Sequence, residues 1–519
     1  MEVDAAQYAA ISMEMSFTKS FLHVFENGND YLDKPPFLFW ISATSFLLFD
    51  ISNFTYKLPS VLFAVLGLYS TYRFSKIYYD DKTSYLSALI LGTSQALFLI
   101  TNDIRTDTIL MSSIIFSVWQ MAEYLKSGRF RNLLFLSLGV AVGMMTKGPL
   151  ILVVLAAAFG YDLLVNKQWK SIFKVEWIFL LVFVAILLLP MLWGLYTQFD
   201  LHPEKTAYGI ESPSGLKFFF WTQSFGRITG ENAFKNDTSF FYFFHTILWD
   251  FQPWIFFFIP AFFKRIKEAI VSVFSKMKPQ KEQITVAGFF FIFIALSLSS
   301  YKLPHYIFSI FPFASIITAN YMTGLSKKMS LKFSNLQFVI LHLFWVAIGI
   351  ILIFVFPEKT IFKLLLFGIG YLIFILTFIK LKDRHERLYI PTVITALFFN
   401  LIMAIHFYPN LLFYQSSTQA GRYIADNNID IYTYNVRHKA LSFYAKKLIQ
   451  PYNLNEIKNA ERGKFIYTDS QGLDSINQSR SFEIIKTYDY FKSTQLNLSF
   501  LNQSKRDSQL KNIFILKLK

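Results

Sequence analysis

The chain has 519 residues, of which 54% are apolar, 19% aromatic and only 16% charged, and its mean hydropathy is +0.39. A soluble domain is closer to a quarter charged, so this composition excludes disordered, coiled-coil and ordinary cytosolic proteins. The net charge of +16 would suit nucleic-acid binding, but the basic residues gather in loops between apolar segments, so we predict no nucleic-acid partner. The absence of cysteine excludes disulfides, thiolate metal sites and a cysteine nucleophile.

Long apolar segments predict a polytopic all-α membrane protein, because ~20 apolar residues span the core of a bilayer. We count twelve such spans in chain order: 57–75, 84–101, 107–125, 132–146, 149–165, 175–196, 239–262, 286–300, 305–323, 336–356, 360–379 and 388–407. They define a transmembrane domain over residues 57–410. The apolar segment 36–50 is shorter and ends in Asp50, so we interpret it as an interfacial or re-entrant helix.

The distribution of Lys and Arg predicts which loops face the cytoplasm. Alternate connections are rich in basic residues, beginning with Arg73, Lys76 and Lys82, and this charge also favours contact with anionic membrane lipids. The opposite set then faces outside: residues 1–56, the long loop 197–238 and everything after 408. An external N-terminus with no helix before it leads us to expect that a first helix is missing from this chain.

Beyond residue 416 the sequence becomes polar. Strand-like segments occur at Ile429–Tyr434, Lys464–Thr468 and Ile513–Leu518, around a helix-like segment at Lys439–Leu448. We therefore predict a small external α/β domain over residues 416–519. Residues 1–56 are predicted to form a first external loop with interfacial helices.

Ionisable residues in short external segments are candidates for function, because charge near a membrane is costly. They gather on the predicted external side: Glu2, Asp4, Asp33, Lys34, Asp103, Arg105, Asp107, Lys147, Arg227, Lys302 and His305, followed by Tyr306. Carboxylates suit general-base or metal-ligand work, whereas Lys and Arg suit a phosphorylated ligand. Such a set is what an enzyme needs to act on a lipid-linked phosphate ester at a membrane surface.

Simple structural roles stay open for each of these residues. They are a helix cap for Asp4, a helix-start turn for Asp33 and Lys34, an interhelical turn for Lys147, a salt-bridge cluster for Asp103, Arg105 and Asp107, and an interfacial belt for His305 and Tyr306. Taken one at a time, the residues do not separate these roles from a catalytic site.

Taken in order, the motifs resemble one enzyme family. They are Glu2-Val3-Asp4-Ala5-Ala6-Gln7-Tyr8-Ala9, Asp33-Lys34-Pro35-Pro36, Arg105-Thr106-Asp107, Thr146-Lys147-Gly148-Pro149, Gln252-Pro253-Trp254 and Lys302-Leu303-Pro304-His305-Tyr306. In this register they resemble the bacterial GT-C membrane glycosyltransferases related to protein O-mannosyltransferases and lipid A aminoarabinose (4-amino-4-deoxy-L-arabinose) transferases. The resemblance covers residues 1–325 well and the rest in architecture.

The resemblance implies a GT-C fold of thirteen transmembrane helices, the first of which would be missing here. It implies a hexosyl- or pentosyltransferase that moves a sugar from a polyprenyl-phosphate donor to lipid A, an envelope glycan or a protein. The enzyme would be a multi-pass protein of the bacterial cytoplasmic (inner) membrane. Its active site and C-terminal domain would face the periplasm or the outside.

The resemblance also implies roles for the candidate residues. Asp4 would be the catalytic carboxylate, with Glu2 and Asp107 as further carboxylates. The donor phosphate would be bound by Lys34, helped by Arg227, Lys302, His305 and Tyr306. The pocket would include Asp33, Asp103, Arg105 and Lys147.

One departure from the family leaves a question open. Many relatives carry Asp-Glu where this chain has Asp4-Ala5, so the second carboxylate and the participation of a divalent metal ion stay open, and no other cofactor is implied. An oligosaccharide ligase or polymerase of the GT-C superfamily is the alternative function. A transporter is a further alternative, although it would call for inverted repeats and charges at the membrane midplane, whereas the charges here lie at one interface.

Overall fold

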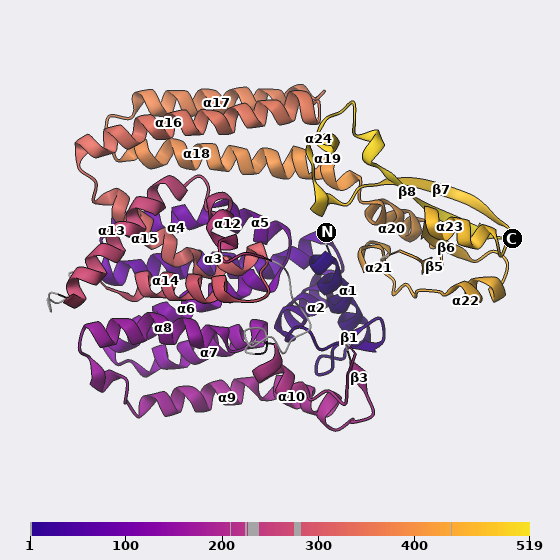
Figure 1. The fold of residues 1–519 in the computed structure, drawn as a ribbon, viewed down its shortest axis with the longest axis horizontal. Coiled ribbons are helices and arrows are strands. Elements are labelled where there is room, and N and C mark those ends of the chain that lie inside the picture. The colour runs from indigo at the N-terminus through magenta and orange to yellow at the C-terminus, as the bar shows by residue number, and fades with distance from the viewer. Residues whose placement is uncertain (1–2, 208, 224–225, 227–237, 275–281, 437–438) are drawn as a thin grey trace.

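The computed structural model describes residues 3–207, 209–223, 226, 238–274, 282–436 and 439–519. Its long helices lie side by side in layers, and a small sheet domain covers one end of them (Figure 1). The N-terminal helix α1 lies at the same end, beside the sheet domain.

The first segment is helical on both sides of a short hairpin. It consists of α1 (Val3–Thr18), β1 (Phe25–Glu26), β2 (Asn29–Asp30) and α2 (Phe37–Phe49). The predicted helix at 36–50 is therefore confirmed as α2. Three hydrogen bonds hold α1 in place: the buried Tyr56 hydroxyl donates to the Ala5 carbonyl at 2.8 Å, and the Glu14 carboxylate accepts from the amides of Asn27 and Gly28 at 2.6 and 2.8 Å.

Seven helices follow with short connections: α3 (Asn53–Tyr78), α4 (Asp81–Gly92), α5 (Gln95–Asn102), α6 (Thr106–Ser127), α7 (Phe130–Lys147), α8 (Leu150–Val165) and α9 (Glu176–Leu195). Local signals set several ends. Ser52 and Thr55 form a capping box before α3, Asp80 caps α4, and Gly128 ends α6 in the left-handed conformation at φ 64°. Helix α6 packs between α3 and α7, which places its N-terminus inside the molecule.

The short helix η1 (Trp169–Ser171) precedes α9. In the described part of the loop after α9 the elements are short: η2 (Tyr196–Asp200), β3 (Thr206–Ala207), β4 (Ile210–Glu211), α10 (Gly215–Lys217) and η3 (Phe218–Thr222). The helical region then continues with α12 (Tyr242–Asp250), α13 (Ile255–Phe274), α14 (Ile284–Leu298), η4 (Pro304–Ile310) and α15 (Phe311–Thr323). Helix α15 packs against α4 and α13, and α14 packs against α8.

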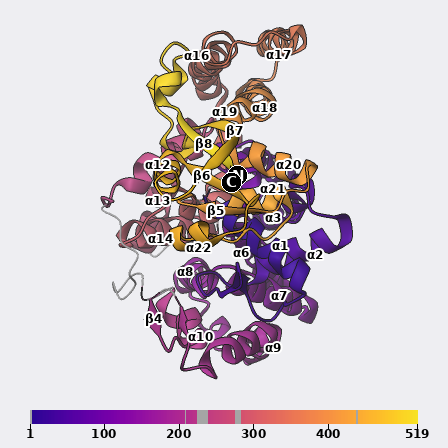
Figure 2. The same cartoon turned by 90° about the vertical axis from the view of Figure 1, so that its right-hand side faces the viewer.

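Three further helices form a separate layer, which both views show (Figures 1 and 2). They are α16 (Lys327–Ile350, extended by η5, Ile351–Val355), α17 (Ile361–Lys380) and α18 (Glu386–Ile402, extended by η6, Met403–Phe407). This layer has its own apolar core around Trp345, Phe374 and Ile402. The short helix α19 (Tyr408–Phe413) leads from it to the sheet domain.

A helix or a pair of consecutive helices occupies each of the twelve predicted spans. Span 84–101 is broken into α4 and α5, which meet at 49°, and span 239–262 is broken into α12 and α13 around Pro253. Among the described residues, four helices are long and apolar enough on their own to cross a membrane, or five if α4 and α5 count as one. Helices α8 and α14 are equally apolar but have only 16 and 15 residues.

The C-terminal region is an α/β domain, as predicted. Its elements are α20 (Ser416–Asp426), β5 (Ile431–Tyr434), α21 (Lys439–Ala445), α22 (Leu454–Asn459), β6 (Phe465–Asp469), α23 (Ser470–Asn477), β7 (Phe482–Tyr490), η7 (Ser493–Gln495), α24 (Leu498–Leu501), η8 (Asp507–Gln509) and β8 (Lys511–Leu518). The strand order is β5-β6-β8-β7, with β5 and β6 parallel and the other pairs antiparallel. Helices cover both faces: Ile515 packs with α20 and α21, and Leu516 packs with α22 and α23.

The C-terminal domain rests directly on the first segment. Helix α21 packs against α1, and its Phe443 ring lies 6.0 Å from Phe46 and 5.8 Å from Tyr56. Because Tyr56 also holds the Ala5 carbonyl, one aromatic cluster joins the C-terminal domain to the N-terminal turn of α1.

Candidate functional site

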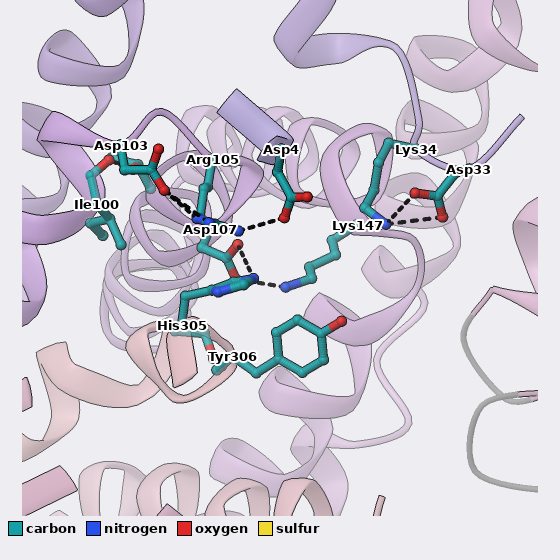
Figure 3. Close-up of polar contacts among 12 residues, drawn as sticks. Asp4, Asp33, Lys34, Ile100, Asp103, Arg105, Asp107, Lys147, His305 and Tyr306 are labelled. Atoms are coloured by element: carbon teal, nitrogen blue, oxygen red, sulfur yellow. Dashed lines mark hydrogen bonds and ion pairs between the residues drawn. The ribbon is translucent and has the colours of Figure 1, made fainter. Parts of the chain in front are cut away.

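A cavity of ≈ 260 Å³ lies where α1, the α5–α6 turn, the α7–α8 turn and η4 meet (Figure 3). It is lined by Asp4, Gln7, Tyr8, Asp33, Lys34, Arg105, Thr106, Asp107, Lys147, Tyr301, Leu303, His305 and Tyr306. Eight of these residues were predicted as site residues from the sequence. The structure thus brings into one cavity residues that are up to 300 positions apart in the chain.

Asp4 lies in the first turn of α1 and is joined to the α5–α6 turn by an ion pair. Arg105 Nη1 lies 2.5 Å from Asp4 Oδ2, and Arg105 Nη2 lies 2.8 Å from Asp103 Oδ2. Burial of the Arg105 guanidinium opposes its charge, but Asp103, Asp4 and Asp107 outweigh burial and raise its pKa above the ordinary value. Arg105 is therefore a permanent cation that bridges two carboxylates, and the Asp4 side chain remains 36% exposed.

Asp107, Lys147 and His305 form the buried side of the cavity. Lys147 Nζ lies 2.6 Å from Asp107 Oδ1, and His305 Nε2 lies 3.7 Å from Asp107 Oδ2. The Asp107 side chain is only 1% exposed, so its charge depends on the Lys147 ammonium. Lys147 is the last residue of α7, and Gly148 follows at φ 73°, a conformation that favours glycine and turns the chain sharply into α8.

Lys34 is on the opposite side of the cavity, in the segment just before α2. Its ammonium lies 2.9 Å from Asp33 Oδ2 and 3.0 Å from Asp33 Oδ1. The Gln223 side chain, from the end of η3, donates to the Asp33 carbonyl and so ties this segment to the loop after α9. Two proline residues, Pro35 and Pro36, precede α2 and stiffen the same segment.

Aromatic side chains form a third part of the wall. Lys147 Nζ lies 4.0 Å from the centre of the Tyr306 ring, and the Tyr306 ring lies 6.4 Å from that of Tyr301. Tyr8 faces the cavity from α1, where burial, assisted by Asp4, Asp33 and Asp107, raises the pKa of its hydroxyl. The Tyr8 hydroxyl therefore stays protonated and can donate a hydrogen bond.

Among the residues that the structure describes, the charges that line the cavity are balanced. Three cations, Lys34, Arg105 and Lys147, face three carboxylates, Asp33, Asp4 and Asp107, and each cation is already paired with a carboxylate. An anionic ligand would therefore share cations that the protein already holds in fixed positions. Such preorganised cations stabilise a phosphate group at little reorganisation cost.

Two of the remaining predicted site residues, Asp103 and Lys302, are described by the structure and do not line the cavity. Asp103 holds Arg105 but is not among the residues that line the cavity. Lys302 is buried, and its ammonium donates to the Thr238 carbonyl at 3.1 Å rather than lining the cavity. Glu2 and Arg227 lie outside the described residues.

Five lining residues were not predicted: Gln7, Tyr8, Thr106, Tyr301 and Leu303. Gln7 and Tyr8 follow Asp4 by three and four positions, so once α1 is a helix they share a face with Asp4. That spacing was visible in the sequence and would have found both residues.

The described side chains do not form a metal-binding set. Among the residues that the structure describes, no group of three or more His, Asp or Glu side chains is placed to hold a metal ion. The lining carboxylates instead pair with Lys34, Arg105 and Lys147.

The sequence comparisons agree with the resemblance seen in the motifs. Residues 33–193 match the family model described as dolichyl-phosphate-mannose-protein mannosyltransferase. The chain thus resembles the GT-C membrane glycosyltransferases, and this prediction is confirmed.

The curated relatives are more specific. The chain is 23% identical over 337 residues to an undecaprenyl phosphate-alpha-4-amino-4-deoxy-L-arabinose arabinosyl transferase of Proteus mirabilis, which covers 63% of this chain and 56% of that protein. It is 25% identical over 330 residues to an undecaprenyl phosphate-alpha-4-amino-4-deoxy-L-arabinose arabinosyl transferase from Edwardsiella ictaluri, and this match covers 62% of this chain and 55% of that protein. The match therefore spans about half the length of these relatives.

The solved structures extend the likeness to the whole chain. ArnT from Cupriavidus metallidurans bound to undecaprenyl phosphate matches with a TM-score of 0.74 and 15% identity, covering 99% of this chain and 93% of that one. The same protein in the apo state matches with a TM-score of 0.72 and 14% identity. The chain therefore has the ArnT fold, including the C-terminal domain.

Proposed function

We propose that the protein is a glycosyltransferase that moves one sugar from a polyprenyl-phosphate donor to an acceptor, which is lipid A, an envelope glycan or a protein. The observation that carries this proposal is the cavity in which a partly exposed carboxylate, Asp4, faces the cations Lys34 and Lys147. The names of the matched relatives supply the donor class, since they describe transferases that use undecaprenyl phosphate-linked aminoarabinose.

In the proposed reaction, the bond between the sugar C1 and the phosphate oxygen breaks as a bond from the acceptor oxygen to C1 forms. Asp4 accepts the proton of the acceptor group as its general base. Arg105 holds Asp4 Oδ2, so in the described part of the chain Oδ1 is the oxygen available for this proton. The polyprenyl phosphate leaves with its negative charge stabilised by Lys34 and Lys147.

Other residues support this chemistry by holding Lys147 and Asp107 in position. Asp107, which is fully buried, holds the Lys147 ammonium in place rather than meeting the acceptor itself. His305 lies on the other oxygen of Asp107, and Tyr306 lies under the Lys147 ammonium. We propose that Arg227 assists at the phosphate, and that Glu2 is a further carboxylate near Asp4, as the family resemblance implies.

The experiment is a transfer assay with the purified full chain in lipid vesicles. Radiolabelled donors would be undecaprenyl phosphate carrying 4-amino-4-deoxy-L-arabinose, mannose, glucose or galactose, and the acceptor would be total membrane extract. We expect label to move from one of these monophosphate donors into the extract. Transfer only from a diphosphate-linked oligosaccharide would instead support the ligase alternative.

We also propose an arrangement in the bacterial cytoplasmic membrane. Residues 57–410 would cross it with twelve spans, and residues 1–56, the loop 197–238 and residues 416–519 would lie outside, with the cavity. The basic connections support this orientation.

Because the chain has no cysteine, Ser127→Cys and Ser508→Cys each introduce a single thiol at an exposed position. An impermeant maleimide should label residue 508 in intact spheroplasts and residue 127 only after permeabilisation; the reverse pattern would contradict the topology.

A further inference from the structure

A line of polar contacts connects the C-terminal domain to the cavity. It begins at Lys439, the first residue of α21, whose ammonium forms an ion pair with Glu26 in the β1–β2 hairpin. Glu26 in turn accepts hydrogen bonds from Gln7 Nε2 at 3.0 Å on Oε1 and 2.9 Å on Oε2. Gln7 lines the cavity, one helical turn from Asp4.

This arrangement fixes which way the Gln7 amide faces. A carboxylate only accepts hydrogen bonds, so the amide nitrogen of Gln7 must face Glu26. The amide oxygen, Oε1, is then on the side of the group away from Glu26 and is the face left for a ligand. The ion pair with the Lys439 ammonium holds the Glu26 carboxylate in place against the Gln7 amide.

The contacts are shielded enough to hold a preferred orientation. The side chains of Lys439 and Glu26 are 30% and 22% exposed, and Gln7 is partly buried. The domain boundary around them is packed, since α21 lies against α1 and Asn27 Nδ2 donates to the Ile449 carbonyl at 3.1 Å. The C-terminal domain is therefore in a position to influence a group inside the cavity.

We propose that Lys439 and Glu26 are positioning residues that orient the Gln7 amide, so that its oxygen accepts a hydrogen bond from a hydroxyl or amino group of the sugar on the donor. This inference rests on the proposed function and deepens it. Lys34 and Gln7 line the same cavity, so a sugar attached to a phosphate at Lys34 meets the wall that contains Gln7. The ≈ 260 Å³ cavity is smaller than the roughly 300–1,000 Å³ of pockets for drug-sized ligands, and suits a single sugar ring.

The test compares binding of two lipids to the full chain in detergent: sugar-free undecaprenyl phosphate, and whichever undecaprenyl-phosphate sugar of the four-donor panel the wild type transfers. The variants are Lys439→Met and Glu26→Gln, with Lys439→Arg as the conservative rescue. The matched control is Lys446→Met, because Lys446 pairs across the same domain boundary with Asp50 at 3.3 Å but is not connected to Gln7 by the contacts described above.

We expect Lys439→Met and Glu26→Gln to weaken binding of the sugar-bearing lipid about three- to tenfold, the worth of one hydrogen bond. Binding of the sugar-free lipid should stay at the wild-type value, Lys439→Arg should restore most of the loss, and Lys446→Met should have no effect. A merely structural role would weaken both lipids equally and would overturn the inference, as would an unchanged ratio of the two affinities. If the wild type bound neither lipid, or transferred no sugar, the proposed function itself would fail and the inference with it.

Discussion

Replacing Lys147 by methionine should destabilise the protein markedly, because it leaves the Asp107 carboxylate buried without its closest cation. The Asp107 side chain is 1% exposed, and Lys147 Nζ lies 2.6 Å from it. Removing one partner of a buried ion pair costs about 3–5 kcal/mol. Since Lys147 is itself 12% exposed, we expect about 3 kcal/mol, the lower end of that range.

The assay is thermal unfolding in detergent, followed by the fluorescence of the nine tryptophans at a single scan rate, since unfolding of such a protein is commonly irreversible. The apparent Tm should fall by several degrees in Lys147→Met. Adding Asp107→Asn to this variant removes the unpaired charge, so the double variant should recover most of the loss. A double variant no more stable than Lys147→Met would refute the argument that uncompensated charge causes the effect.

Three further predictions concern the donor phosphate, helix α1 and the C-terminal domain. Lys34→Met should weaken binding of undecaprenyl phosphate about 10- to 100-fold, the worth of a hydrogen bond to a charged group, and binding within twofold of wild type would contradict Lys34 as a phosphate ligand. Tyr56→Phe removes the 2.8 Å hydrogen bond to the Ala5 carbonyl, so we expect the free energy of unfolding to fall by about 1 kcal/mol and sugar transfer to slow. If stability fell but the transfer rate did not change, this hydrogen bond would not position Asp4. Burial raises the pKa of Tyr467 from 10.0 to about 12, so as the pH rises this tyrosine ionises first in the unfolded chain. The free energy of unfolding is therefore unaffected below pH 10 and falls by about 2–3 kcal/mol as the pH approaches 12. The Tyr467→Phe variant has no hydroxyl to ionise, so the difference in apparent Tm between wild type and variant should shrink from pH 9 to pH 12. A difference that stays constant over this range would refute the assignment of the pH dependence to Tyr467.

The helices could be predicted from the sequence because each apolar run is long and bounded by charged loops. The breaks inside two of them could not. At the break between α4 and α5, the Thr93 hydroxyl accepts from Trp254 Nε1 at 3.0 Å, a contact between distant parts of the chain. Strand β7 was also missed, since most of its side chains are exposed or only partly buried, as expected for an edge strand, and give no clear alternation of apolar residues.

Eight residues that line the cavity could be predicted from the sequence, because ionisable side chains are costly at membrane depth and those present are candidates for function. Their pairing could not be predicted. Asp4 and Arg105 are 101 positions apart, and Asp107 and Lys147 are 40 apart. These pairs exist because α6 packs against α7 and the first segment covers the α5–α6 turn, which no local pattern encodes. The contact from Lys439 to Glu26 joins two predicted domains and was equally invisible in the sequence.

The most direct test of the central claim compares sugar transfer by wild type, Asp4→Asn and Asp103→Asn. Both aspartates form ion pairs with Arg105, but only Asp4 lines the cavity. If Asp4 is the general base, Asp4→Asn should lower the transfer rate about 10²- to 10⁴-fold, while Asp103→Asn should stay within about tenfold of wild type. Wild-type transfer by Asp4→Asn, or an equal loss in both variants, would contradict the assignment of Asp4 as the catalytic carboxylate.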